Sequence, residues 1–312
     1  MSIYPAAAQA PAQQLSFALL WPLGLLPVGL VIAWFLGAMR ERSIEGPLRT
    51  EPREPLGRLW VVTFFGLFVW MMVPALYAAA VHPASPTTTA TTNALNDLSP
   101  AQKLRSYILG QSCAVGALLI ANVATSRAAL LRLGLVPRGF PRGLLLGVLG
   151  ALAAIPLTIG MSALVQVILQ QLERPTPQDH ELIKIFRSAP VEVRRMVILS
   201  ATVLAPVFEE TFFRGHVQTA LAATLAAMGT PRSADLTEPV PSTPSPAIRW
   251  LAIAVVSALF ASVHGINWMF APLYLLSLCL GYAYERTGNL WVPITMHASF
   301  NTLSLLMAML SL

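Results

Sequence analysis

The sequence predicts an all-α, polytopic integral membrane protein, a helical bundle of about eight transmembrane helices. Of its 312 residues, 55% are hydrophobic and 11% are charged, whereas soluble domains contain roughly 25% charged residues. The mean hydropathy of +0.65 shows the same bias. A soluble chain of this length would lack the polar residues that it needs to cover its surface, so we expect the helices to lie in a lipid bilayer.

Eight apolar runs are candidates for helices that cross a bilayer, which takes about 20 residues. They comprise residues 15–39, 59–81, 107–125, 144–169, 196–228, 250–264, 268–284 and 290–310. No Lys or Arg precedes the first run, so it lacks the basic segment of a cleavable signal peptide and is expected to be a retained helix. The polar, Pro-rich stretches 46–57, 83–100 and 229–246 are expected to be loops.

The charged residues are distributed as in the loops of a membrane protein. The net charge of +6 arises from 20 Lys plus Arg and 14 Asp plus Glu. The basic residues cluster at the ends of apolar runs, within 40–58 and 127–142, which is typical of loops at a membrane surface. No nucleic-acid partner is expected. Cys113 and Cys279 both fall inside apolar runs and provide no disulfide framework.

Three charged side chains interrupt the run 196–228: Glu209, Glu210 and Arg214. Glu209 lies 13 residues beyond Met196, which at ~1.5 Å per residue is about 20 Å along a helix and deep in hydrocarbon. An ionised side chain at that depth costs at least about 2.5 to 3.5 kcal/mol. These residues therefore need partners or a function.

The spacing of these residues separates the roles of the two acids. Arg214 follows Glu210 by four positions, so the two side chains share one helix face at salt-bridge distance. Glu209 points about 100° away around the helix, so Arg214 cannot pair with both acids equally and Glu209 remains for another role. Pro206, just before the pair, removes a backbone hydrogen bond and is expected to kink the helix and open space near the glutamates.

Two later runs add further polar groups. His264 ends one of them, and His297 and Asn301 lie four residues apart in the last run, on one helix face and about 6 Å apart along its axis. As isolated residues in lipid these groups would be costly, but gathered around one wet cavity they are compatible with a membrane bundle. Phe260, one turn before His264, is expected to form a wall of that cavity.

Such a cavity is suited to hydrolysing a peptide bond. A carboxylate beside an imidazole can deprotonate water, either directly or by sharing a divalent metal that lowers the pKa of the water to about 7. A second imidazole and the Asn301 amide can donate hydrogen bonds to the oxyanion that forms at the carbonyl. No Ser or Cys lies in a nucleophile motif and no His-Glu-x-x-His run occurs. Direct attack by activated water is therefore favoured over a covalent intermediate.

Three motifs occur in order along the chain: EETFFR from Glu209 to Arg214, FASVH from Phe260 to His264, and HASFN from His297 to Asn301. They resemble the EExxxR, FxxxH and HxxxN motifs of the CPBP intramembrane proteases, the family that contains the CAAX prenyl endopeptidases. The resemblance covers roughly residues 133–312. We therefore divide the chain into N-terminal transmembrane helices with polar loops, residues 1–125, and a CPBP-type protease core, residues 126–312.

The resemblance implies an intramembrane metalloendopeptidase. In such an enzyme, Glu209 with His264 would activate water, and His297 with Asn301 would stabilise the oxyanion. Glu210 would support this centre, and Arg214 would hold an acid in place.

The resemblance also implies a cofactor and partners. Both a metal-dependent and a metal-free glutamate mechanism have been argued for the family. We favour a divalent metal, with zinc as the first candidate and Glu209, His264 and His297 as its ligands, since imidazole and carboxylate groups suit that ion. The implied partners are the lipid bilayer and a peptide or protein substrate, prenylated or membrane-anchored, processed in the CAAX manner. The implied location is a bacterial cytoplasmic membrane.

Two other functions stay open at this stage. The motif residues would only hold helices together in a non-catalytic membrane partner or immunity factor. In a proton-coupled transporter the glutamates would form a relay, although the sequence lacks the paired, interrupted helices of many transporters. His216, six residues beyond Glu210, faces elsewhere on the helix and is expected to have a packing or interfacial role.

Overall fold

The computed structural model describes residues 56–81, 98–125, 129–174, 186, 189–228, 244–265 and 268–310. The expected first helix, residues 15–39, lies outside these ranges. Within them the chain is helical, and the part of the chain that they cover contains no β-strand. The predicted all-α class is confirmed.

The other seven expected runs each coincide with helical segments of the described chain. The α-helices are α2 (Leu56–Val81), α4 (Pro100–Thr125), α5 (Ala129–Arg132), α6 (Phe140–Gln171), α8 (Val191–Leu199), α9 (Ala205–Glu210), α10 (Thr219–Met228), α11 (Pro246–Val263), α12 (Phe270–Thr287) and α13 (Trp291–Leu310). A 3₁₀ turn, η2 (Pro137–Gly139), precedes α6, and two π-helical segments, η3 (Ser200–Leu204) and η4 (Thr211–Gln218), flank α9.

Five helical rods among the described residues are long and apolar enough to cross a membrane, judged by length and composition. They are Leu56–Val81, Pro100–Ala124, Ala129–Gln171, Val191–Met228 and Pro246–Val263. Helices α12 and α13 contain 18 and 20 residues but are not among these five. The chain is an integral membrane protein, whereas the number of about eight spans stays a prediction.

Large apolar side chains lie exposed on the outer faces of the spanning helices. Phe64 on α2, Ile120 on α4 and Leu152 on α6 are 60%, 71% and 62% exposed. In water, extended apolar surfaces of this kind promote association or aggregation. The lipid tails of a bilayer solvate them, so the outer surface fits a membrane.

Residues 191–228 form a continuous rod of α8, η3, α9, η4 and α10, which we call the central helix. Its middle part, α9, carries both glutamates and has Pro206 in its first turn. A π-helical turn accommodates an extra residue and is frequent at functional sites. The central helix is therefore irregular on both sides of the acids, in the region where Pro206 led us to expect a kink.

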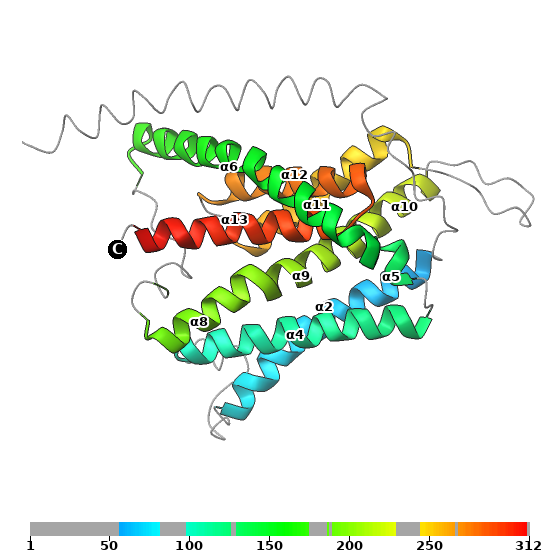
Figure 1. Cartoon of the computed structure of the whole chain (residues 1–312), viewed down its shortest axis with the longest axis horizontal. Helices are drawn as coiled ribbons and strands as arrows, with labels where there is room; N and C mark the ends of the chain where they lie inside the picture. Colours follow the sequence, from blue (N-terminus) through cyan, green and yellow to red (C-terminus); the bar gives the residue numbers. More distant parts are fainter. Residues whose placement is uncertain are drawn as a thin grey trace, which may run out of the picture.

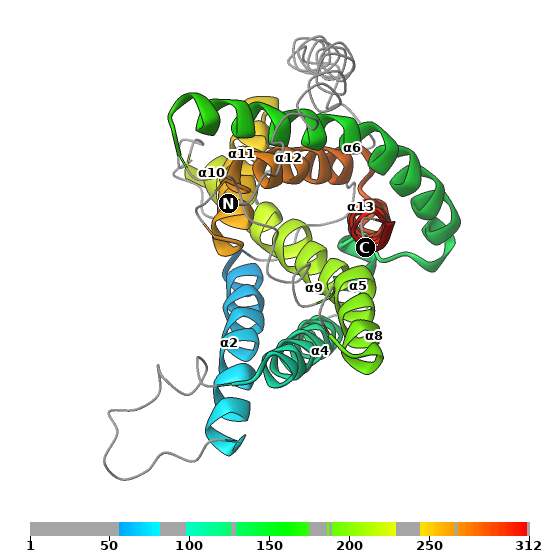
Figure 2. The same cartoon turned by 90° about the vertical axis from the view of Figure 1, so that its left-hand side faces the viewer.

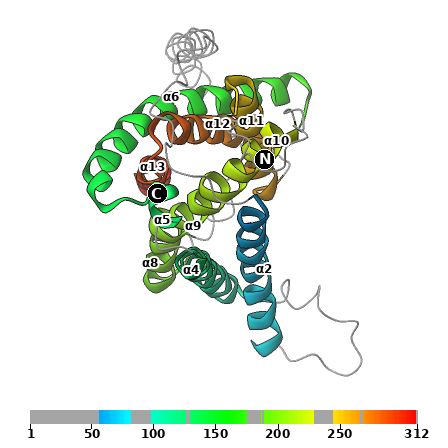
Figure 3. The same cartoon turned by 90° about the vertical axis from the view of Figure 1, so that its right-hand side faces the viewer.

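The central helix lies between two groups of helices (Figure 1). Helices α2 and α4 cover one side, and Figures 2 and 3 show α6 arching over α12 and α13 on the opposite side. One apolar cluster joins Leu118 of α4 and Phe260 of α11 to Phe212 of the central helix. A second cluster joins Ala151 of α6 to Met296 of α13. The polar residues of the central helix are thus enclosed by packed helices.

Small residues let α6 approach α13 closely. Gly143, Gly147 and Ala151 are buried at four-residue steps along one face of α6. A Cβ atom on Gly147 would lie 2.5 Å from the Cβ atom of Thr295. Close approach through small residues is typical of transmembrane helix pairs. This contact fixes the position of α13, which carries His297.

We predict that Gly147→Ala destabilises the protein by about 1 to 3 kcal/mol, because the added methyl group overpacks the α6 and α13 contact. Gly116→Ala is the matched control, since a Cβ atom there meets nothing within 4 Å. Chemical denaturation in detergent, followed by circular dichroism, measures both variants. Equal stability of the two variants would show that the close approach does not constrain α13.

Candidate active site

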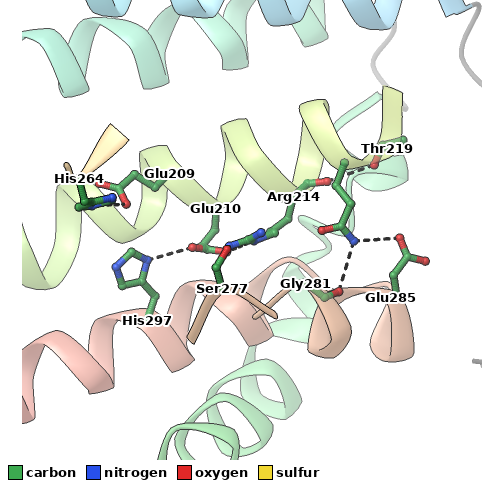
Figure 4. Close-up of polar contacts among 10 residues, drawn as sticks. Glu209, Glu210, Arg214, Thr219, His264, Ser277, Gly281, Glu285 and His297 are labelled. Atoms are coloured by element: carbon green, nitrogen blue, oxygen red, sulfur yellow. Dashed lines mark hydrogen bonds and ion pairs between the residues drawn. The ribbon is translucent and has the colours of Figure 1, made fainter. Parts of the chain in front are cut away.

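Glu210 and Arg214 form an ion pair inside the bundle (Figure 4). Arg214 Nε donates to Glu210 Oε2 at 3.0 Å, and both side chains are fully buried. Nη2 of the same guanidinium donates to Ser277 Oγ of α12 at 2.7 Å. The pairing expected from the four-residue spacing is confirmed.

The second oxygen of Glu210 contacts His297 of α13. His297 Nδ1 lies 2.9 Å from Glu210 Oε1. A carboxylate that already accepts from Arg214 offers only acceptor positions, so Nδ1 carries the proton and donates it. Nε2 is then the ring nitrogen of His297 that remains for other partners, and both oxygens of Glu210 are engaged.

Glu209 and His264 lie beside each other, apart from the contacts of Glu210 (Figure 4). His264 Nδ1 donates to the carbonyl oxygen of Phe260 at 2.8 Å, so a neutral His264 presents the lone pair of Nε2. This nitrogen lies 3.8 Å from Glu209 Oε2. That oxygen is buried and has no hydrogen-bond partner among the described residues. Two acceptor atoms therefore face each other across a gap that a donor molecule is needed to bridge.

The two acids differ in access to solvent. The side chains of Glu209 and His264 are 14% and 26% exposed, whereas those of Glu210 and Arg214 are 0% exposed. A substrate that reaches this site therefore meets Glu209 and His264 before it meets the buried pair. This arrangement agrees with the separation of roles that the sequence predicts.

Asn301 contacts the central helix one turn beyond His297. Its Nδ2 donates to the carbonyl oxygen of Ala201 at 2.8 Å, within the π-helical segment η3. The amide group has a second N–H, which remains for another acceptor. The structure thus brings both His297 and Asn301 against the central helix, as their shared face predicts, and the oxyanion role of Asn301 stays a prediction.

Phe260 lies among the polar side chains of the site. Its ring centroid is 4.7 Å from that of His264 and 5.8 Å from that of His297. The guanidinium carbon of Arg214 lies 5.3 Å from the same ring, a cation–π contact. Phe260 is itself fully buried, so it acts as an apolar divider between the two histidines and the arginine.

Sequence reasoning missed the polar residues that α12 contributes. Ser277, Gly281 and Glu285 follow each other at four-residue steps and face the central helix (Figure 4). Gln218 Nε2 contacts the Gly281 carbonyl oxygen at 3.3 Å and Glu285 Oε1 at 3.0 Å. Glu285 Oε2 in turn lies 3.8 Å from Arg249 Nη1. The four-residue spacing of these polar or small residues in an apolar run was the sequence pattern that could have predicted their contact with another helix.

His216 lies outside this group. It is fully buried, and its Nε2 is 3.1 Å from Asn122 Nδ2 of α4. Because Asn122 Nδ2 donates to the Leu118 carbonyl oxygen at 2.7 Å and is therefore an amide nitrogen, His216 Nε2 is the acceptor of the second bond. The expected packing role of His216 agrees with this contact between helices.

The described residues supply part of the expected zinc site. No group of three or more His, Cys, Asp or Glu side chains in the described part of the chain is arranged to hold a metal ion. Glu209 Oε2 and His264 Nε2 supply two donors of suitable type. The third expected ligand, His297, has its Nδ1 engaged by Glu210, which leaves its Nε2 for another partner. We therefore derive no catalytic step from a metal, and zinc stays a prediction.

Comparison with known families identifies the segment that carries this site. Residues 192–303 match the family described as type II CAAX prenyl endopeptidase Rce1-like. The match contains all six predicted site residues, which are Glu209, Glu210, Arg214, His264, His297 and Asn301. Comparisons with curated proteins and with solved structures gave no match. The resemblance to the CAAX and CPBP proteases is confirmed at the level of the family.

We predict that Arg214→Met lowers the free energy of unfolding by about 3 to 5 kcal/mol, because it leaves the Glu210 carboxylate buried without its partner. The control is Arg195→Met. It removes a pair with Glu192 whose side chains are 72% and 79% exposed, and such a change costs less than about 1 kcal/mol. Denaturant titration in detergent measures both. Recovery of stability when Glu210→Gln is added to Arg214→Met would identify the unpaired charge as the cause.

Proposed function

Since the segment with the polar site matches the family described as type II CAAX prenyl endopeptidase Rce1-like, we propose that the protein is an intramembrane endopeptidase that cleaves peptides by water activated at Glu209 and His264. One observation carries the proposal: Glu209 Oε2 and His264 Nε2, two acceptors on different helices, lie 3.8 Å apart. A water molecule with hydrogen bonds of about 2.8 Å to each acceptor spans such a gap.

The first step is attack by this water. The water donates one hydrogen bond to Glu209 and one to His264, which orients an oxygen lone pair toward the substrate carbonyl carbon. Glu209 takes a proton as the new C–O bond forms, and the carbonyl oxygen becomes an oxyanion. The proton then passes to the leaving amine as the C–N bond breaks, so the carboxylate is restored.

His297 and Asn301 support the developing charge in this proposal. To donate from Nε2, His297 must carry protons on both ring nitrogens, and Glu210 Oε1 at 2.9 Å from Nδ1 supplies the counter-charge. The second N–H of the Asn301 amide is the other donor. Oxyanion donors of this kind each contribute roughly 100- to 1000-fold to the rate.

The substrate proposed is a peptide or protein held at the membrane, with prenylated CAAX-type C-termini as the first candidates. The family description names this activity for the family. The site lies within a bundle whose outer faces carry large apolar side chains, and a lipid-modified substrate would share the bilayer with that surface. Location in a bacterial cytoplasmic membrane remains part of the proposal.

We predict that Glu209→Gln and His264→Asn each lower kcat by at least about 100-fold, because each removes a group that binds and deprotonates the water. The assay uses purified protein in liposomes with an internally quenched, farnesylated CAAX peptide. Glu192→Gln is the control, since this acid is 79% exposed and outside the site. Wild-type activity of Glu209→Gln would overturn the mechanism. If wild-type protein fails to cleave both this peptide and its unprenylated form, the assigned activity is wrong.

A metal measurement separates the two mechanisms argued for the family. Zinc held by Glu209, His264 and His297 predicts one ion per chain in active protein, whereas direct activation of water by Glu209 and His264 predicts much less than one. Metal content is measured by mass spectrometry on the preparation whose activity is assayed. Stoichiometric zinc that is lost in His264→Ala but kept in His216→Ala, a buried histidine outside the site, would establish the metal site, and active protein without zinc would exclude it.

A further inference from the structure

We infer that Ser277 on α12 is a positioning residue for His297, acting through Arg214 and Glu210. The inference rests on the proposed function, since it assigns His297 a role in that reaction. Ser277 itself lies three hydrogen bonds away from His297 and belongs to none of the three sequence motifs. Its role follows from the chain of short contacts that ends at the imidazole.

Three hydrogen bonds connect Ser277 to His297 without a gap (Figure 4). Ser277 Oγ accepts from Arg214 Nη2 at 2.7 Å. Arg214 Nε donates to Glu210 Oε2 at 3.0 Å, and Glu210 Oε1 accepts from His297 Nδ1 at 2.9 Å. Every member of this chain is at most 5% exposed, so water does not replace a missing partner from bulk solvent.

Ser277 differs from three other serines in the helices of this bundle. Ser162, Ser262 and Ser304 each donate to a carbonyl oxygen four residues earlier in their own helix, the usual choice for serine in a helix. Ser277 Oγ instead accepts from a charged group of another helix. A hydrogen bond to a charged group is about twice as strong as a neutral one.

The contact of Ser277 controls the orientation of the guanidinium. Nε of Arg214 is held by Glu210 and Nη2 by Ser277, while Nη1 has no hydrogen-bond partner among the described residues. Without the hydroxyl group, the guanidinium keeps one hydrogen bond, to Glu210, and its contact with the Phe260 ring, and it can turn about that hydrogen bond. Glu210 uses one oxygen for Arg214 and the other for His297, so a rotation of its carboxylate moves the imidazole as well.

A separate contact keeps α12 on the central helix when Ser277 is changed. One turn further along, Gln218 Nε2 binds the Gly281 carbonyl oxygen and Glu285 Oε1 at 3.3 Å and 3.0 Å. This pair of bonds does not involve Arg214. We therefore expect Ser277→Ala to fold and to alter the site rather than the bundle.

The test compares Ser277→Ala with Ser257→Ala in the liposome assay. Ser257 is a matched control because it is also a fully buried serine, on α11, and its Oγ makes no hydrogen bond among the described residues. We expect Ser277→Ala to lower kcat by about 10- to 100-fold and to leave KM within about twofold. Ser257→Ala keeps both constants, and Ser277→Thr, which retains the hydroxyl group, recovers most of kcat.

A spectroscopic readout makes the inference independent of the substrate. The ring-nitrogen signals of ¹⁵N-labelled His297, assigned by their loss in His297→Gln, report its hydrogen bond to Glu210. We expect them to shift in Ser277→Ala and to stay unchanged in Ser257→Ala, even if the peptide is not cleaved and the proposed function fails. Unshifted His297 signals in folded Ser277→Ala overturn the inference, as does a loss of kcat that Ser257→Ala reproduces.

Discussion

The structure depends on how a carboxylate is kept ionised inside a membrane. Glu210 lies fully buried, where an unpaired charge is strongly unfavourable. Each of its oxygens binds a cationic or protonated nitrogen, one from Arg214 on the same helix and one from His297 on α13. Because Arg214 also binds Ser277, the requirement of this single carboxylate ties α12 and α13 to the central helix. The packing of the C-terminal helices is thus coupled to the placement of the imidazole.

The neighbouring acid has the opposite environment because of its position on the helix. Glu209 points away from Arg214, is partly exposed and keeps an oxygen without a hydrogen-bond partner among the described residues. The two adjacent glutamates therefore differ in role. Glu210 has both oxygens hydrogen-bonded, whereas Glu209 keeps an oxygen that can accept a hydrogen bond. A site that binds and deprotonates water needs the second kind of carboxylate.

Local spacing predicted the parts of this arrangement that lie on single helices. The pairing of Glu210 with Arg214 and the different direction of Glu209 follow from the helical period. The composition predicted an all-α membrane protein. Ser277 and the bond from Asn301 to Ala201 depend on how neighbouring helices are rotated and shifted relative to each other. Hydropathy is a poor guide to that rotation, because most positions on these helices are apolar and the polar row of α12 is short. The π-helical segments were also missed. Pro206 indicates that the α-helical hydrogen bonding is interrupted, but it does not indicate that the neighbouring turns are π-helical.

Both oxygens of Glu210 are engaged, which limits the groups that can carry a proton during turnover. With Arg214 and His297 occupying both oxygens in a fully buried position, this carboxylate has no free site at which to take up or release a proton. In the proposed cycle the proton removed from water and given to the amine is therefore carried by Glu209, while His264 helps to hold the water. Each turnover returns Glu209 to its starting charge. The buried group of Glu210, Arg214 and His297 consequently keeps a constant charge throughout the proposed cycle.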